Sequence, residues 1–193
     1  MLFVLFIIIG VTIACTLGLT IGVNFFGIAE QVVYLDIFYS VAALAIIDLI
    51  PAIIIRFLPK KWFNPESKLF KVYKWEKGLY LKLGVRHWKD KIPEAGKYLE
   101  GFSKSEVVDT SNNEYILQFI DKTIRGELMH FLGFVFSGLI AFIYPTVFVV
   151  IGLPLMLTNM LINILPVIVQ RYNRPKLLLL YKRNLSKTKK DSK

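Results

Sequence analysis

Two long stretches of this sequence, residues 1–55 and 126–170, contain neither lysine nor arginine. All 24 basic residues lie in two blocks, from Arg56 to Arg125 and from Arg171 to Lys193. At about 1.5 Å per helical residue, each of these stretches is long enough to cross the roughly 30 Å hydrocarbon core of a bilayer twice. This alternation of apolar and basic stretches is typical of an integral membrane protein.

The composition excludes several other classes of protein. The 193 residues are 55% hydrophobic and carry a formal net charge of +10, and a soluble domain of this length cannot bury so much apolar surface. Because the positive charge flanks apolar stretches, it indicates contact with a membrane surface and not with nucleic acid. One cysteine, Cys15, excludes a disulfide framework, and two histidines, His87 and His130, supply few metal ligands. We therefore expect no bound metal or cofactor.

The sequence predicts an all-α polytopic membrane protein with four transmembrane helices arranged as two hairpins. A basic interfacial segment connects the hairpins, and the positive-inside rule places this segment and both termini in the cytoplasm. Gly152 and Pro154 are expected to separate the third span from the fourth. The expected transmembrane helices are residues 2–29, 32–57, 130–152 and 153–170, with the basic segment at 58–126 and a basic tail at 171–193.

The basic segment should lie on the membrane surface because it is too small for a core of its own and rich in aromatic residues. Lysines recur every third residue from Lys68 to Lys77, which predicts an interfacial helix that ends at Gly78. The alternation from Leu79 to Val85 then predicts a short strand or extended stretch. A polar loop is expected at residues 103–113. The tail from residue 182 onward is expected to be a disordered polybasic anchor.

Polar side chains in membrane spans are costly, so their positions are the main indication of function. Glu127 and His130 are three residues apart on one helical face, where a hydrogen bond could fix the imidazole tautomer. An interfacial salt bridge is the alternative for this pair. Asn159, Asn163 and Gln170 form a polar stripe on the fourth span, which could serve a ligand or simply join helices. Two further questions stay open in the sequence: whether Asp48 is neutral or pairs with an arginine, and whether His87 has a function.

Four basic residues, Arg86, Lys89, Arg171 and Arg174, are expected to converge where the basic segment meets the helix ends. Such a cluster suits a phosphate, a carboxylate or the nucleotide part of a thioester, and it suits anionic lipid headgroups equally well. The sequence contains no glycine-rich phosphate loop and no nucleophile elbow.

Three segments resemble a known family. These are Arg125–Phe131 (RGELMHF), Ile168–Leu177 (IVQRYNRPKL) and Val85–Ile92 (VRHWKDKI). They resemble the bacterial glycosyl-4,4'-diaponeurosporenoate acyltransferases of staphyloxanthin-type carotenoid biosynthesis, over roughly residues 62–177. The resemblance implies that a sugar hydroxyl of a glycosylated C30 carotenoic acid, or of a related glycolipid, is esterified with a fatty acyl chain. The acyl donor would be an acyl-CoA or an acyl carrier protein.

For this reaction we expect His130 as the general base and Glu127 as its orienting partner. The partners would be membrane lipids, the glycosylated acceptor and the acyl donor, and the sequence leaves the oligomeric state open. A non-catalytic membrane adaptor or lipid-binding protein, and a small transporter component, remain as alternatives. The residues expected to bind substrate or to stabilise the oxyanion are Arg86, Trp88, Lys89, Arg125, Asn163, Gln170, Arg171, Tyr172, Asn173 and Arg174.

Overall fold

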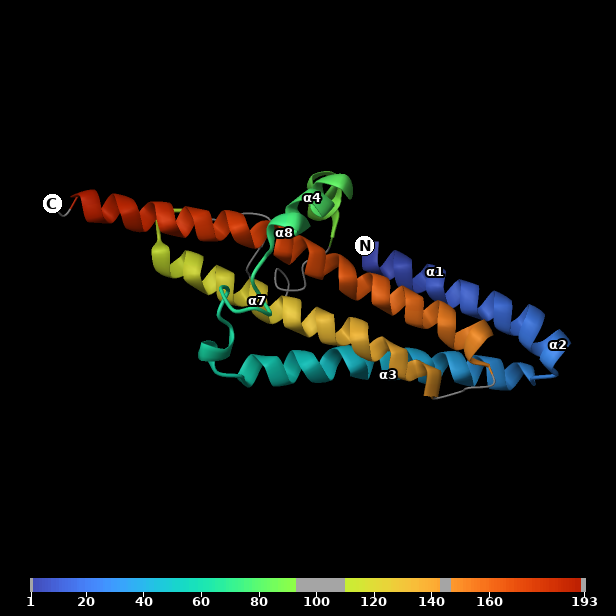
Figure 1. Ribbon diagram of the computed structural model, residues 1–193. Coiled ribbons are helices and arrows are strands. Elements are labelled where there is room, and N and C mark those ends of the chain that lie inside the picture. Colours follow the sequence, from blue (N-terminus) through green and yellow to red (C-terminus); the bar gives the residue numbers. More distant parts are fainter. Residues whose placement is uncertain (1, 93–109, 143–146, 192–193) are drawn as a thin grey trace. The chain divides into compact units, whose positions relative to one another are not determined.

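The computed structural model describes residues 2–92, 110–142 and 147–191, which contain helices and no β-strand (Figure 1). Four of its helical stretches are long and apolar enough to cross a membrane. The predicted fold class, an all-α protein with four membrane-length helices, is therefore confirmed. These stretches are Val4–Phe26, Glu30–Phe57, Asn113–Phe142 and Phe148–Lys187.

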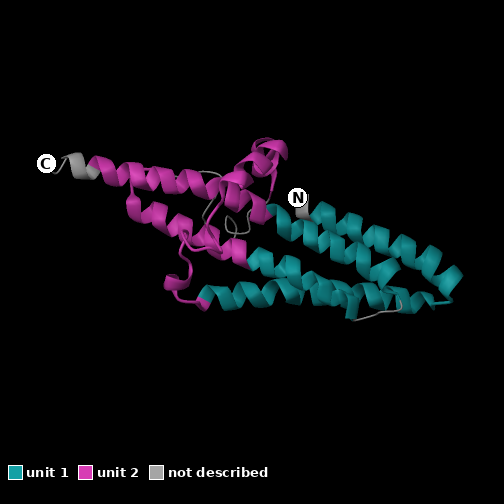
Figure 2. Ribbon diagram, viewed as in Figure 1, with its two compact units in different colours: residues 1–56, 129–165 teal, residues 57–128, 166–193 magenta. Residues whose placement is uncertain are grey.

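The chain divides into two compact units (Figure 2). Unit 1 consists of residues 1–56 and 129–165, and unit 2 of residues 57–128 and 166–193. Arg56, the last residue of the first stretch, is the single basic residue of unit 1, and every other lysine and arginine belongs to unit 2. Unit 1 thus contains most of the two stretches that lack lysine and arginine, and unit 2 contains the basic segment and the basic tail.

The first half of unit 1 is a helical hairpin. Helix α1 (Leu2–Leu17) continues through a π-helical turn, η1 (Gly18–Val23), into the short α2 (Asn24–Phe26). Gly27 then reverses the chain with a left-handed backbone, φ 65°, which glycine adopts without steric cost. Helix α3 (Glu30–Phe57) returns, so both helices lie close to the spans predicted at 2–29 and 32–57.

The second pair of membrane-length helices differs from the prediction. Helix α7 (Asn113–Phe136) continues as a 3-10 turn, η4 (Ser137–Phe142). A π-helical turn, η5 (Phe148–Gly152), continues directly into α8 (Leu153–Asp191). The range predicted for the third span, 130–152, therefore joins the end of one helix to the beginning of the next.

The predicted break at Gly152 and Pro154 is wrong for a local physical reason. Pro154 follows the π-helical turn η5 almost directly, and the helical path continues past it as α8. Gly152 is required by close packing, since a Cβ there would lie 2.7 Å from Cδ2 of Phe148. Neither residue interrupts the helical path in this structure.

Small residues bring the helices of unit 1 into close contact. A Cβ at Gly10 of α1 would lie 2.2 Å from Oγ1 of Thr158 on α8, and one at Gly18 would lie 2.6 Å from Cγ1 of Val33 on α3. Lipid supplies no hydrophobic driving force between helices, so helices in a membrane associate through such close backbone contacts at small residues. The buried core consists of Ala14, Val33, Ile37, Leu44, Ile140, Val147, Val150, Ile151 and Leu155.

The strand predicted near Leu79 is wrong, because these residues belong to helix α4 (Lys74–Lys82). The side chain of Glu76 accepts a hydrogen bond from the backbone N–H of Tyr73 at 2.9 Å, which stabilises the first turn. Gly78 lies inside this helix and does not end it. The helix ends at Lys82, and Gly84, with a φ of 59°, allows the turn into α5 (Val85–Trp88).

The predicted disordered tail is also contradicted, since α8 continues as far as Asp191. Residues 176–185 are mostly leucine, lysine and arginine, which have high helix propensity. Leu177 is 6% exposed, so packing within unit 2 supports this part of the helix. Most of the polar loop predicted at residues 103–113 lies outside the described residues, and its last residue, Asn113, begins α7.

Candidate functional site

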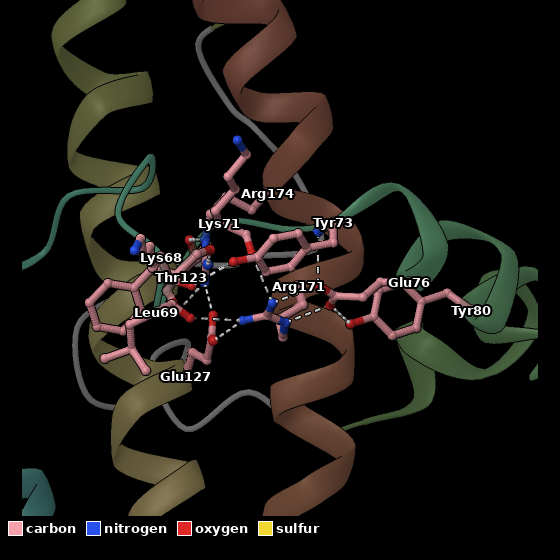
Figure 3. Close-up of polar contacts among 11 residues, drawn as sticks. Lys68, Leu69, Lys71, Tyr73, Glu76, Tyr80, Thr123, Glu127, Arg171 and Arg174 are labelled. Atoms are coloured by element: carbon pink, nitrogen blue, oxygen red, sulfur yellow. Dashed lines mark hydrogen bonds and ion pairs between the residues drawn. The ribbon is translucent and has the colours of Figure 1, made fainter.

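A cluster of buried ion pairs lies at the centre of unit 2 (Figure 3). Glu127 of α7 binds Arg171 through Oε1 and Arg174 through Oε2. The two arginines are three residues apart, so they share a face of α8 and can reach one carboxylate together. The segment Ile168–Leu177, one of the three that carry the family resemblance, thus supplies both cations of the cluster.

Arg171 extends the cluster to a second carboxylate. Its Nε and Nη2 donate to the two oxygens of Glu76, both at 2.7 Å, in the bidentate geometry that a guanidinium favours. Nη2 also donates to the carbonyl of Lys71 at 3.0 Å. Tyr80, one turn along α4, donates its hydroxyl to Oε2 of Glu76. Arg171 therefore fixes both the segment before α4 and the helix itself.

Arg174 has no exposed surface at all. Its Nη1 donates to the carbonyl of Phe70 at 2.8 Å, while Nε and Nη2 donate at 3.2 Å to the hydroxyl and the carbonyl of Thr123. A buried guanidinium is tolerated only when such hydrogen bonds and a counter-charge compensate its desolvation. The predicted contact of Arg174 with a substrate would require these bonds to open, and that role stays a prediction.

The electrostatics of the cluster favour the charged carboxylate of Glu76. Burial alone would raise the pKa of Glu76, but hydrogen bonds from Arg171, from the Tyr73 backbone and from Tyr80 outweigh it and hold the pKa below its usual value. Burial and the adjacent Glu76 carboxylate raise the pKa of Tyr80, which therefore keeps its proton as a donor. Sequence reasoning missed Glu76, although it is the one acidic residue between Glu66 and Asp90.

Several other predicted residues of unit 2 have local partners. Arg125 donates to Asp121 at 2.8 Å and to the Leu58 carbonyl at 3.0 Å, with its guanidinium 4.0 Å above the Phe63 ring. The ring of Tyr172 lies edge-on to Tyr80 at 6.3 Å. Arg125 and Tyr172 thus contribute to packing within unit 2.

The residues predicted to hold a headgroup lie around α5. Arg86 is exposed, and Asn173 on α8 is half-buried. Trp88 donates its indole N–H to the Leu83 carbonyl at 3.0 Å, and Lys89 pairs with its neighbour Asp90. Arg86 is thus the exposed cation of this region, while Lys89 is ion-paired.

Gln170 is the predicted site residue with an unused hydrogen-bonding atom. Its side chain is 4% exposed, and Oε1 is buried without a hydrogen-bond partner among the described residues. An unsatisfied buried acceptor costs about 1–3 kcal/mol. A ligand that donates a hydrogen bond to this oxygen would remove the cost.

A second polar cluster lies in unit 1, among apolar spans. Nδ1 of His130 on α7 lies 3.0 Å from Oδ1 of Asn163 on α8, and Nδ2 of Asn163 donates to Oδ1 of Asp48 on α3 at 3.0 Å. Because an amide oxygen can only accept, Nδ1 of the imidazole carries the proton in this arrangement. Nε2 is then the basic nitrogen. The network therefore selects the tautomer that a general base needs.

The same network continues deeper into the bundle. Asn159 donates to Ser137 at 3.0 Å and to Asp48 at 3.3 Å, so Asp48 accepts from two asparagines of the polar stripe. The sequence left Asp48 either neutral or paired with an arginine, and the structure gives it these amide partners. Gly133 makes the approach possible, since a Cβ there would lie 2.5 Å from Oδ1 of Asp48 and 2.8 Å from Oδ1 of Asn163.

Glu127 and His130 lie three residues apart on α7, as the spacing requires. Both carboxylate oxygens of Glu127 are bound by arginines, and Nδ1 of His130 is held by Asn163. The structure thus gives each side chain a partner that the sequence did not predict. The role of Glu127 as the orienting partner of His130 stays a prediction.

Among residues 2–92, 110–142 and 147–191, no group of three or more histidine, cysteine or acidic side chains could hold a metal ion.

Comparison with known proteins identifies the family. Residues 59–183, more than half of the chain, match the family described as glycosyl-4,4'-diaponeurosporenoate acyltransferase. The chain belongs to this family. The resemblance seen in the sequence is thereby confirmed, and the family is one of acyltransferases.

Two curated relatives show the degree of similarity. The glycosyl-4,4'-diaponeurosporenoate acyltransferase of Staphylococcus aureus strain MRSA252 is 31% identical over 127 residues, which cover 62% of this chain and 72% of the relative. The protein of the same name from strain N315 is 29% identical over 132 residues, with the same coverage. No solved structure matches the chain. The matched family region includes His130, Asn163 and the whole ion-pair cluster, but it begins after Asp48.

Proposed function

We propose that this acyltransferase esterifies a sugar hydroxyl of a glycosylated C30 carotenoic acid with a fatty acyl chain, and that His130 is the general base. The acceptor is carried over from the names of the family and its relatives. The observation that supports the base is the hydrogen bond between Nδ1 of His130 and Asn163, because a neutral ring that donates through Nδ1 has Nε2 as its basic nitrogen.

In the proposed reaction His130 acts first as a general base and then as a general acid, so that no net proton is gained or lost. Nε2 of His130 removes the proton of the sugar hydroxyl while the hydroxyl oxygen attacks the carbonyl carbon of an acyl thioester. The tetrahedral intermediate collapses, the carbon–sulfur bond breaks, and the imidazolium returns the proton to the departing thiolate. Asn163 holds the ring through both steps, and Asp48 orients Asn163. No metal or redox cofactor is needed for this chemistry.

The proposed substrates have long apolar chains and polar headgroups, which suits a protein with one apolar and one basic unit. Unit 2 exposes large apolar side chains beside lysines on α4, among them Trp75 at 67% and Leu81 at 63% exposure. Such a surface fits the boundary between lipid and water, with its cations toward anionic headgroups. We propose that this surface and both termini face the cytoplasm, because the positive-inside rule applies to unit 2.

The donor headgroup is assigned to the basic residues around α5. Arg86, which is exposed, would bind the phosphates of acyl-CoA or the phosphopantetheine arm of an acyl carrier protein, together with the indole of Trp88 and with Lys89, whose pair with Asp90 would open. Arg171 and Arg174 would support this region by fixing the segment before α4, since their own guanidinium groups are already bound. Gln170 is proposed to accept a hydrogen bond from substrate through Oε1.

The experiment that tests this function is mass spectrometry of pigment extracts. Cells that make the glycosylated C30 carotenoic acid would carry either the full chain or an empty vector. We expect the glycoside to gain the mass of one fatty acyl group in the first extract alone. If the chain is present in the membrane fraction and the glycoside mass is unchanged, the acceptor is wrong.

A further inference from the structure

A mostly apolar cavity of about 240 Å³ lies within unit 1. Helices α1, α3 and α8 supply its walls, and Asp48, Thr158 and Asn159 are its polar residues. The proposed reaction uses Asp48 through its network and leaves the cavity itself unexplained. The apolar lining consists of Ile7, Val11, Val41, Leu44, Ala45, Leu155 and Ile162.

The cavity runs along the spans, away from the basic end of the bundle. Its lining on α3 extends from Asp48 to Val41, which is about 10 Å at 1.5 Å per residue. Asp48 itself lies about 12 Å along the helix from Arg56, the residue that marks the basic end. The polar end of the cavity is therefore the end nearer the headgroup region, and its apolar part extends toward the bilayer centre.

The polar end of the cavity is continuous with the network that holds His130. Asp48 and Asn159 line the cavity, and Asp48 accepts from Asn163, which in turn holds Nδ1 of His130. Thr158 already donates to the Pro154 carbonyl at 2.8 Å, so its hydroxyl oxygen faces a ligand as an acceptor at most. A chain in the cavity would thus begin at the catalytic network.

We propose that this cavity binds the fatty acyl chain of the donor, with the carbonyl end of the chain toward Asp48; this inference rests on the proposed function. A methylene takes about the room of a water molecule, whose share of liquid volume is about 30 Å³, so the cavity holds on the order of eight methylene groups. An extended chain of eight methylenes is about as long as the lining on α3. The match of length and volume indicates one extended hydrocarbon chain.

A flexible acyl chain fits this cavity better than the C30 polyene of the acceptor. A conjugated polyene cannot fold, and its volume would be several times that of the cavity, at about 30 Å³ per carbon. The partly open cavity can take the first half of a fatty acyl chain and leave the remainder among lipid chains. The cavity lining would then contact the half of the acyl chain that lies nearer the carbonyl.

The test is photolabelling with palmitic acid that carries a diazirine in the middle of its chain. The probe is bound to the purified full chain in lipid nanodiscs, irradiated, and located by peptide mass spectrometry. We expect label on the buried cavity residues Leu44 and Leu155. We expect Ala45→Phe, on the exposed rim of the cavity, to lower it about tenfold, because the added ring fills the site. The neighbouring Ile46→Phe, on a side chain that does not line the cavity, should change it by less than about twofold.

A second pair of variants tests the same cavity from another helix, in case Ala45→Phe misfolds. Val11→Phe fills the cavity from α1 and should also abolish the label, whereas Ile13→Phe on a 45% exposed side chain should not. Label distributed equally over lipid-facing residues, or unchanged in both filling variants, would overturn the proposal. Competition by the glycosylated C30 carotenoid and not by unlabelled palmitate would also overturn it, because the polyene would then be the occupant.

The labelling result and the proposed function can fail separately. Specific label on the cavity without any transfer product would retain the acyl-chain site and reject the carotenoid acceptor. If Ala45→Phe forms the transfer product at the parental rate and no specific label is found, the proposed function is retained and the cavity is rejected as the acyl site.

Discussion

The buried ion pairs of unit 2 lead to a quantitative prediction for Glu127→Gln. The substitution keeps the size of the side chain and removes the charge that lies between two guanidinium groups. Arg171 would keep Glu76, with two hydrogen bonds of 2.7 Å. Arg174, with no exposed surface, would lose the one carboxylate that the structure describes beside it.

The expected cost follows from the burial of Arg174. Leaving one member of a buried ion pair without its partner typically costs about 3–5 kcal/mol. The remaining bonds of Arg174 to Phe70 and Thr123 are to neutral groups and do not replace a counter-charge. For a chain of this size 1 kcal/mol changes the Tm by about 2–4 °C, so we expect the Tm to fall by about 6–20 °C.

The assay is thermal unfolding of the full chain in detergent, followed by the loss of monodisperse protein. Glu66→Gln is the matched control, because Glu66 pairs with Lys182 at 3.4 Å on the exposed surface and such pairs contribute at most about 1 kcal/mol. Adding Arg174→Met to Glu127→Gln should recover much of the loss, since the unpaired cation is then removed.

The result that would refute this reasoning is a Tm of Glu127→Gln within about 2 °C of the parent chain. If transfer activity were lost at the same time, the sequence-based prediction that Glu127 orients His130 would be favoured. A large fall in Tm, with activity retained at low temperature, would support Glu127 as a structural anion.

Three further predictions concern packing, pH and ligand binding. Gly133→Ala should cost about 1–3 kcal/mol and lower activity through overpacking, while Gly138→Ala, which has no atom within 4 Å of the new Cβ, should be silent in both assays. The pKa of Glu76 is held below its ordinary value of 4.5, so the stability that its carboxylate contributes is complete above that pH and is lost as the pH falls through the folded pKa. The difference in Tm between the parent chain and Glu76→Gln should therefore shrink in acid. Gln170→Leu should raise or preserve the Tm but raise KM, since it removes an unsatisfied buried oxygen and a proposed substrate contact; a lower Tm with an unchanged KM would contradict both statements.

Charge pattern predicted the fold better than local periodicity did. The absence of lysine and arginine from residues 1–55 placed the first hairpin close to its observed position. A membrane span depends on the composition of a whole stretch of about 20 residues and not on single residues. The alternation around Leu79 and the glycine at position 78 suggested a strand and a helix end. A hydrogen bond from the Tyr73 backbone to Glu76 and packing of Tyr80 produced a helix there, and neither is visible in a pattern of seven residues.

The candidate sites show the same limit. The polar residues at His130, Asn159 and Asn163 could be found from the sequence, since each is expensive within an apolar span. Their partners could not, because Asp48 is brought to Asn163 by the packing of separate helices. Glu76 was missed for the same reason, as its ion pair with Arg171 joins residues 95 positions apart.

The central claim is that His130 is the base of an acyl transfer. The most direct measurement is the rate of acyl transfer from an acyl thioester to the glycosylated C30 acceptor by purified protein in liposomes, for His130→Ala and His87→Ala. His87 is exposed on α5, so its variant is the matched control. We expect His130→Ala to lose about 10²–10⁴-fold in rate, measured well below the Tm of each variant, and His87→Ala to keep the parental rate. Full activity of His130→Ala would contradict the account.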